Sequence, residues 1–188
     1  WNNPEPEVVL AINSRGAIVG ATLGNDVNLR DIEGRSALLL GKAKDNNGSC
    51  AIGPFIRLFD AGFGIDDVRA CELTLRVQGP EGFELAGSSS MRLISRDPLD
   101  LAAQVIGPNH QYPDGVVLFL GTMFAPVKDR RGAGQGFTHE LGDRVEIATP
   151  RLGRLVNWVE RTDACPPWTF GTKALIRNLA ARGLLDKV

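Results

Sequence analysis

Short apolar segments separated by turn residues are the feature that most restricts how this chain can fold. Glycine supplies 22 of the 188 residues, about 12% against a usual ~7%, and there are 11 prolines. Between two such turns, residues 71–77 alternate apolar and polar side chains without a break. A period of two predicts a strand buried on one face, and frequent turns predict many short strands. We therefore expect a mostly β (α+β) fold with a few short helices.

Turn residues and apolar patterns also predict the strands, helices and loops of the rest of the chain. A turn at Arg15-Gly16 predicts a hairpin between strands over 7–13 and 17–23. Asp97 before Pro98, with Gly107 after the apolar run, predicts a capped helix over 98–106. The sequence also predicts strands from 83 onward and over 143–149 and 154–160, a buried strand over 116–120, a polar turn leading into a short helix over 25–34, a polar loop over 42–54 that runs into a Gly-Pro turn, a flexible loop over 130–136, and a helix over 172–182.

Charge and composition argue against several classes of protein. Lys and Arg total 21 against 22 Asp and Glu, so a polybasic nucleic-acid binder is not expected. The longest clean apolar run, 116–120, is far shorter than the ~18–20 residues of a membrane helix, and no signal peptide is visible. Cys50, Cys71 and Cys165 are odd in number and lack zinc-site spacing. We expect a cytoplasmic protein with reduced thiols and without a nucleic-acid or membrane partner.

Two carboxylates stand out near the start of the chain. In an extended segment Glu5 and Glu7 project from the same face, while Val8, Leu10 and Ile12 take the core face. Two adjacent carboxylates repel each other unless they are solvated or share a cation, and Mg²⁺ prefers such oxygen ligands. The sequence leaves two interpretations open: a metal site, or a solvated pair at a frayed terminus.

Two more charged residues could join this pair. The predicted hairpin returns antiparallel, so Asp26 could lie near Glu5 and Glu7, although it could instead be the N-cap of the following helix. Lys44 in the polar loop could stabilise developing negative charge or relay a proton, although a surface lysine is the alternative.

Other conspicuous residues carry weaker signals. His110 and His139 lie near no nucleophile motif, and we interpret both as structural or surface residues. The glycine-rich stretch 132–136 lacks the order of a nucleotide-binding loop.

Five motifs follow one another in order: Glu5-x-Glu7; Gly24-Asn-Asp-Val-Asn-Leu-Arg-Asp31; Lys44 nine residues before Gly53-Pro54; Pro113-Asp-Gly-Val-Val-Leu-Phe-Leu-Gly-Thr122; and Leu141-Gly-Asp-Arg-Val-Glu-Ile ending in Gly153-Arg-Leu. Together they resemble the catalytic domain of the fumarylacetoacetate hydrolase family over roughly residues 5–159. The resemblance implies a rolled mixed β-sheet of that family's C-terminal domain type. We expect this domain to span 1–162, without some upstream residues, and a C-terminal extension with a helix to span 163–188.

The resemblance also implies a metal centre at the mouth of the sheet. It makes Glu5, Glu7 and Asp26 the metal ligands. Lys44 becomes the catalytic lysine, which also contacts substrate, and Thr122 becomes a substrate contact. Mg²⁺ is the implied cofactor, with Mn²⁺ or Ca²⁺ as alternatives. The implied partners are a small-molecule 2-oxo acid and further copies of the chain, as a homodimer or homotetramer.

Within the family, the chain is most similar to the dehydratases of 2-keto-3-deoxy sugar acids. Three stretches resemble motifs of that branch: Arg30-Asp-Ile-Glu33, Cys50-Ala-Ile-Gly-Pro54 and Gly121-Thr-Met-Phe-Ala-Pro126. The implied reaction is Mg²⁺-dependent dehydration of a 2-keto-3-deoxy pentonate to 2,5-dioxopentanoate. A base removes a C3 proton, the C4 hydroxyl leaves as water, and Lys44 relays a proton or stabilises charge.

Two other functions stay open. A C–C bond hydrolase of a 2,4-diketo acid or acylpyruvate, such as fumarylacetoacetate or fumarylpyruvate, would have the same fold. A metal-binding but inactive module is the second, because the chain begins at Trp1 without the upstream lid residues of the family.

Overall fold

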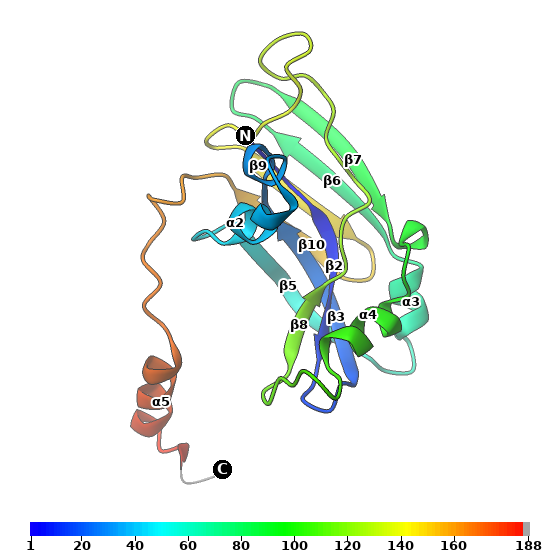
Figure 1. The fold of residues 1–188 in the computed structure, drawn as a ribbon, viewed down its shortest axis with the longest axis vertical. Helices are drawn as coiled ribbons and strands as arrows, with labels where there is room; N and C mark the ends of the chain where they lie inside the picture. The colour runs from blue at the N-terminus through cyan, green and yellow to red at the C-terminus, as the bar shows by residue number, and fades with distance from the viewer. Residues whose placement is uncertain (186–188) are drawn as a thin grey trace.

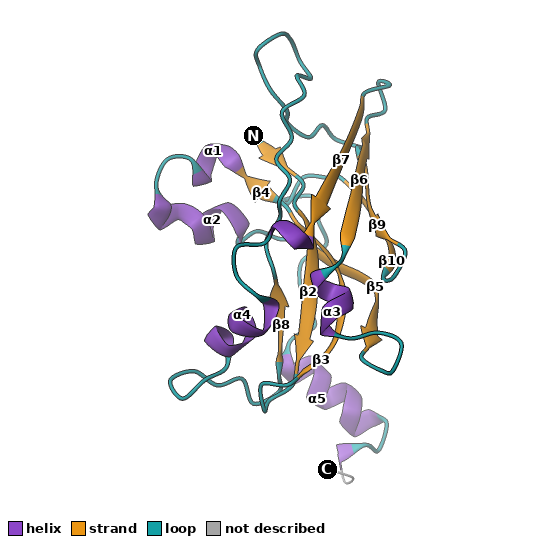
Figure 2. Ribbon diagram, turned by 90° about the vertical axis from the view of Figure 1, so that its right-hand side faces the viewer, coloured by secondary structure: helices purple, strands orange, loops and turns teal. Residues whose placement is uncertain are grey.

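Two packed β-sheets form the body of the protein in a computed structural model that describes residues 1–185 (Figures 1 and 2). One sheet has the strand order β5-β3-β2-β8 and the other β10-β9-β6-β7, while β1 and β4 form a two-stranded ladder. The strands are β1 (Asn2–Asn3), β2 (Pro6–Ile12), β3 (Ile18–Asp26), β4 (Asn28–Leu29), β5 (Cys50–Leu58), β6 (Glu72–Gln78), β7 (Glu84–Ser90), β8 (Val116–Phe119), β9 (Arg144–Thr149) and β10 (Gly153–Trp158). The mostly β class is confirmed, but every ladder between these described strands is antiparallel rather than mixed.

Short helices connect or flank the strands. They are α1 (Arg30–Glu33), α2 (Leu40–Lys44), α3 (Ile65–Arg69), α4 (Pro98–Val105) and α5 (Thr172–Ala181), with 3₁₀ turns over Ala37–Leu39 and Met91–Leu93. The predicted cap of α4 is confirmed, because the Asp97 carboxylate accepts a hydrogen bond from the Leu99 backbone N–H at 2.9 Å. In the described chain, no helix is both long and apolar enough to cross a bilayer.

Helix α5 forms where the sequence predicts it, at the end of an extended segment and apart from the sheets (Figure 1). None of its residues is buried. The division of the chain into 1–162 and 163–188 stays a prediction.

The hydrophobic core lies between the two sheets. Strand β6 buries Leu73, Leu75 and Val77, and the residues between them are exposed, as the alternation predicts. Val8 and Leu10 of β2 belong to the same cluster from the opposite sheet. Burial of such side chains supplies most of the free energy that holds two sheets face to face.

Strand β2 is buried along its whole length and on both faces. Glu7 is only 3% exposed, and Val9 beyond it is fully buried. Gly24 pairs with Glu7 across the ladder, and a Cβ added at Gly24 would lie 2.3 Å from the Phe119 ring. Only glycine leaves room for this ring beside Val9. A solvated pair at a frayed terminus is therefore the wrong interpretation for Glu7.

Two expectations about loops and strands are wrong. The stretch 42–54 is not a polar loop: its start belongs to α2, and Gly53-Pro54 lies inside β5 with a cis peptide bond. Proline is tolerated there because the β3–β5 register shifts at this point, as in a bulge. The strand predicted as buried over 116–120 is present as the edge strand β8, and Leu120 after it is buried, but Val117 is 43% exposed and the other residues of β8 are only half-buried.

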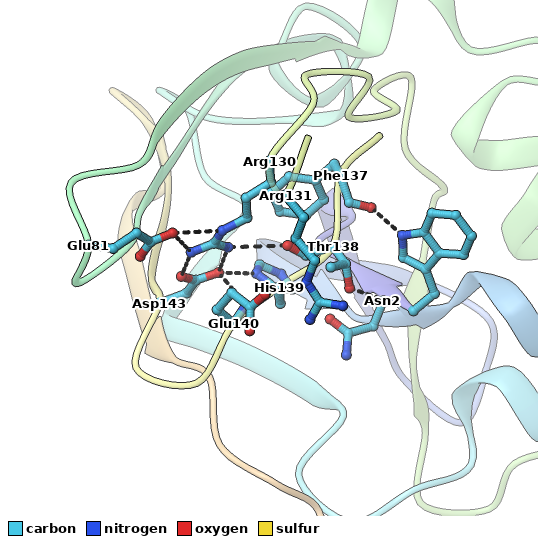
Figure 3. A network of polar contacts seen from close by, with 10 residues as sticks. Asn2, Glu81, Arg130, Arg131, Phe137, Thr138, His139, Glu140 and Asp143 are labelled. Carbon is cyan, nitrogen blue, oxygen red and sulfur yellow. Dashed lines mark hydrogen bonds and ion pairs between the residues drawn. The ribbon is translucent and has the colours of Figure 1, made fainter. Parts of the chain in front are cut away.

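A buried arginine organises the loop that precedes β9. The loop over 130–136 is present, but Arg130 at its start is 2% exposed in its side chain rather than mobile in solvent. Its guanidinium makes two hydrogen bonds of 2.6 Å to the Asp143 carboxylate and also binds Glu81 (Figure 3). Burial opposes ionisation of Asp143, but hydrogen bonds from Arg130, His139 and the Glu140 backbone outweigh it and lower its pKa to about 2. The loop is therefore fixed to the sheet by charge-assisted hydrogen bonds.

We expect Arg130→Met to destabilise the protein by about 3–5 kcal/mol, because it leaves the Asp143 carboxylate buried without its counter-charge. Urea denaturation at pH 7 measures the change. The neighbouring Arg131, which pairs with Glu140 at the surface, is the matched control, and Arg131→Met should cost less than about 1 kcal/mol. Equal effects of the two substitutions would contradict this account of the loop.

Candidate active site

The register between β2 and β3 brings three carboxylates together. Glu7 lies opposite Gly24, and the Asp26 backbone N–H donates to the Glu5 carbonyl at 3.1 Å, so the pairing continues to Glu5. Residues two apart on one strand and their cross-strand neighbour point to the same face. One carboxylate oxygen from each of Glu5, Glu7 and Asp26 lies within 4.8 Å of the other two. The expected convergence is present, and the role of these residues as metal ligands stays a prediction.

Lys44 occupies the positive position in this cluster. Its Nζ lies 2.6 Å from Glu5 Oε2 and 2.9 Å from Asp26 Oδ2, and it donates to the Asp26 carbonyl at 3.0 Å. Helix α2 holds it there, since Ala43 is buried while Lys42 is exposed. Lys44, and not Lys42, therefore faces the carboxylates. The interpretation of Lys44 as a surface lysine is wrong.

The Asp26 side chain lies in the carboxylate cluster and does not cap the next helix. The residue at the N-cap of α1 is Leu29, and no side chain caps that end. The alternative assignment of Asp26 as a helix cap is therefore wrong.

Burial and repulsion between like charges raise the proton affinity of Glu5 and Glu7. Burial is the largest cause that raises the pKa of Glu7 to about 7; the charges of Asp26 and Glu5 also raise it, and the hydrogen bond from the Gly121 N–H opposes them. That bond is 2.6 Å long and ends on Glu7 Oε2. Burial also raises the pKa of Glu5, although Lys44 opposes it. Burial lowers the pKa of Lys44, but hydrogen bonds to Glu5 and Asp26 outweigh it, so the pKa of Lys44 is raised and the amine is an ammonium.

A pocket of about 340 Å³ opens beside Glu5. Thr122 lies on its wall, as do Arg30 and Glu33. The Thr122 hydroxyl accepts a hydrogen bond from the Phe124 backbone N–H at 3.2 Å, and Arg30 donates to the Pro126 carbonyl at 3.3 Å. The segment after β8 is thereby held against the segment after β4.

The sequence analysis did not identify three asparagines that lie at this site. Asn3 and Asn28 also line this pocket, and both side chains are buried with carboxamide oxygens that have no partner among residues 1–185. Asn25 is buried, and its side-chain oxygen accepts from the Glu5 backbone N–H at 3.3 Å. Asparagine is common in turns, so residue type alone did not distinguish these three from loop residues.

Comparison with known proteins places this site in a family. The model of the fumarylacetoacetate (FAA) hydrolase C-terminal domain matches residues 7–160. The chain belongs to the fumarylacetoacetate hydrolase family.

Two curated proteins are similar to the chain. The 2-dehydro-3-deoxy-D-arabinonate dehydratase of Saccharolobus solfataricus is 32% identical over 163 residues, which cover 86% of this chain and 50% of that protein. A protein of Haloferax volcanii named probable 2-keto-3-deoxyxylonate dehydratase is 31% identical, with 85% of this chain and 51% of that protein covered. The chain therefore spans about half the length of the curated relatives that it matches.

Solved structures share the fold of the chain. A 2-keto-3-deoxy-D-arabinonate dehydratase complexed with magnesium and 2,5-dioxopentanoate has a TM-score of 0.73 at 30% identity, over 85% of this chain and 53% of that one. A fumarylacetoacetate hydrolase from Exiguobacterium antarcticum has a TM-score of 0.60 at 20% identity, over 85% of this chain and 56% of that one, and shows the fold alone.

We expect Glu7→Gln to stabilise the metal-free protein above pH 7. The folded-state pKa of Glu7, about 7, lies above its ordinary value of 4.5, so the native state binds more protons between these values. Stability of the wild type should therefore fall as the pH rises from 4.5 to 7, and glutamine removes a loss of up to about 3 kcal/mol. Urea denaturation at pH 5 and pH 8, with EDTA present, measures the difference.

The control for this experiment is Glu72→Gln on the exposed side of β6, which should change stability by less than about 0.5 kcal/mol at either pH. A large loss of stability in metal-free Glu7→Gln would instead identify Glu7 as a structural residue. Adding Mg²⁺ should raise the Tm of the wild type more at pH 8 than at pH 5, because ligands bind metal when deprotonated.

Proposed function

We propose that the protein catalyses the Mg²⁺-dependent dehydration of a 2-keto-3-deoxy pentonate to 2,5-dioxopentanoate. The observation that carries this proposal is the convergence of Glu5, Glu7 and Asp26 beside Lys44. The names of the two curated relatives support it, as does the magnesium and 2,5-dioxopentanoate complex of a dehydratase. The resulting activity is that of a hydro-lyase.

The donor set fits a hard divalent cation. Three carboxylate oxygens lie close enough to share one ion, and such ions prefer oxygen ligands. Glu7 is buried beside two like charges, so a cation would relieve both its desolvation and its repulsion. Glu5, Glu7 and Asp26 are the proposed ligands of Mg²⁺, with Mn²⁺ and Ca²⁺ as alternatives of the same chemistry.

Lys44 and Thr122 have the other proposed roles in the reaction. Bound Mg²⁺ would supply a Lewis acid that polarises the 2-oxo group and acidifies the C3 protons. Lys44, kept as an ammonium by Glu5 and Asp26, stabilises negative charge on the substrate and donates a proton rather than removing one. Thr122 is the proposed substrate contact on the pocket wall.

The reaction balances as a loss of water. A C3–H bond and the C4–O bond break, the hydroxyl leaves as water, and tautomerisation of the unsaturated product forms the C5 aldehyde. No oxidant or reductant is needed.

We also propose that the protein is a cytoplasmic homodimer or homotetramer. Strand β5 exposes Ile52, Phe55, Ile56 and Leu58, a run of large apolar side chains of the kind that forms interfaces. The free thiols of the three cysteines fit a reducing compartment. Light scattering that returns the mass of one chain would contradict the oligomer.

The function is tested by incubating the purified protein with Mg²⁺ and either a 2-keto-3-deoxy pentonate or an acylpyruvate. We expect 2,5-dioxopentanoate to form from the pentonate, detected by NMR, and EDTA to abolish the reaction. Cleavage of the acylpyruvate without dehydration would establish the hydrolase instead. Mg²⁺ binding without either reaction would identify an inactive metal-binding module.

Lys44→Ala should reduce turnover by at least about 100-fold, because the ammonium that stabilises charge at the reacting atoms is lost. Its affinity for Mg²⁺ should stay the same or increase, since Lys44 repels a cation bound by Glu5 and Asp26. Isothermal titration and turnover measurements separate the two effects. The exposed Lys42 is the matched control, and a comparable loss of turnover in Lys42→Ala would make the assignment of Lys44 wrong.

A further inference from the structure

Residues 165–181 form an arm that leaves the body of the protein. An extended segment leads into helix α5, which lies apart from both sheets (Figures 1 and 2). Trp168 on the extended part is 84% exposed, and Phe170, Leu175 and Ile176 are exposed as well. The arm lies beyond residues 7–160, which are the part of the chain that matches the family model. It therefore carries four large apolar side chains that nothing in residues 1–185 covers.

Strand β5 carries a second apolar surface of similar size. Its exposed side chains are Ile52, Phe55, Ile56 and Leu58, which we call the β5 surface. The register shift between β3 and β5 lies at this point, so the consecutive residues Phe55 and Ile56 are both exposed. Strand β5 also ends its sheet, and among the described strands only β3 pairs with it. Exposed apolar patches of this kind mark interaction sites.

The arm and the β5 surface match in length. A strand rises about 3.3 Å per residue, so the β5 surface from Ile52 to Leu58 is about 20 Å long. The apolar part of the arm runs from Trp168 to Ile176, extended before α5 and helical within it. At about 3.3 Å per extended residue and about 1.5 Å per helical residue, it also spans about 20 Å. Each surface is thus long enough to cover the other.

The start of the arm directs it away from its own strand. Cys165 is packed against Gly48, two residues before β5, because a Cβ added at Gly48 would lie 2.9 Å from Cys165 Sγ. Pro166 and Pro167 follow at once. Proline fixes φ near −65°, and consecutive prolines favour an extended chain that acts as a semi-rigid spacer. The apolar residues beyond these prolines are therefore held out in solvent, where a second molecule can receive them.

We infer that the arm of each chain docks on the β5 surface of a second copy, in a reciprocal exchange. A two-fold axis makes each contact occur twice, as in domain-swapped dimers. A buried aromatic side chain covers about 150–250 Å², so Trp168 and Phe170 of two arms bury about 600–1,000 Å². The strand surfaces that receive them bury as much again, which gives the about 1,200–2,000 Å² of a stable interface. The inference rests on the proposed homo-oligomer and not on the dehydratase activity.

Sedimentation of the full chain over a range of concentrations tests the contact. Trp168→Ser combined with Phe170→Ser, the arm variant, should weaken self-association at least about 100-fold, because two aromatic anchors are lost from each contact. Leu58→Lys, the surface variant, should have a similar effect. Leu93 is 71% exposed and lies on neither surface, so Leu93→Ser is the matched control and should associate as the wild type does.

The outcomes separate this inference from the proposed oligomer. Unchanged self-association of the arm variant would overturn the arm exchange and leave the oligomer in place. A wild type that is monomeric at every concentration would overturn both. Dehydratase turnover is not measured in this experiment, so a failure of the proposed reaction changes neither result.

Mixing the two variants shows whether the arm crosses between molecules. The arm variant keeps an intact β5 surface and the surface variant keeps an intact arm, so a mixed pair forms one complete contact. We expect a heterodimer in the mixture, detected with a fluorescent label on one variant, although each variant alone is monomeric at that concentration. An arm that docks on its own strand, or strands that pair directly, would give no heterodimer and overturn the inference. Circular dichroism checks the fold, and Ile52→Lys replaces Leu58→Lys if that variant does not fold.

Discussion

The site depends on one costly arrangement, the enforced closeness of three carboxylates at the buried end of a hairpin. The β2–β3 register places Glu5, Glu7 and Asp26 side by side on one face, and the Phe119 ring packs against Gly24, the residue opposite Glu7. The Lys44 ammonium offsets part of the repulsion, and the Gly121 N–H offsets another part. Each compensating group comes from a different segment, so the packing of α2 and β8 on the hairpin is also what makes the charge cluster tolerable.

Much of the fold could be predicted from local sequence because its causes are local. The alternation of β6, the Asp97 cap of α4 and the hairpin that returns Asp26 toward Glu5 each arise within a few residues. Predicting Lys44 as the inward lysine needed the family interval, because Lys42 and Lys44 are alike in type and differ only in which side of α2 they occupy.

The features that sequence reasoning missed have distant partners. His139 looked unremarkable because its environment depends on Arg130 and on Asn2, and the Asn2 carbonyl accepts from the His139 backbone N–H at 3.2 Å. The Gly53-Pro54 pair was read as a turn because a bulge in the partner ladder cannot be seen from one strand. The same holds for Asn3 and Asn28, whose burial follows from the pairing of β1 with β4 rather than from residue type.

The ladder of β1 and β4 contributes residues to the walls of two different pockets. Asn2 and Asn3 are consecutive residues of β1, and successive side chains on a strand point to opposite faces. Asn2 accordingly lines a cavity together with His139, whereas Asn3 lines the pocket beside Glu5. The loop before β9 holds β1 from one side, through the Thr138 hydroxyl that accepts from the Asn2 N–H, and β4 holds it from the other. The place of Asn3 in the pocket beside Glu5 therefore depends on two segments distant in the sequence, the loop before β9 and strand β4.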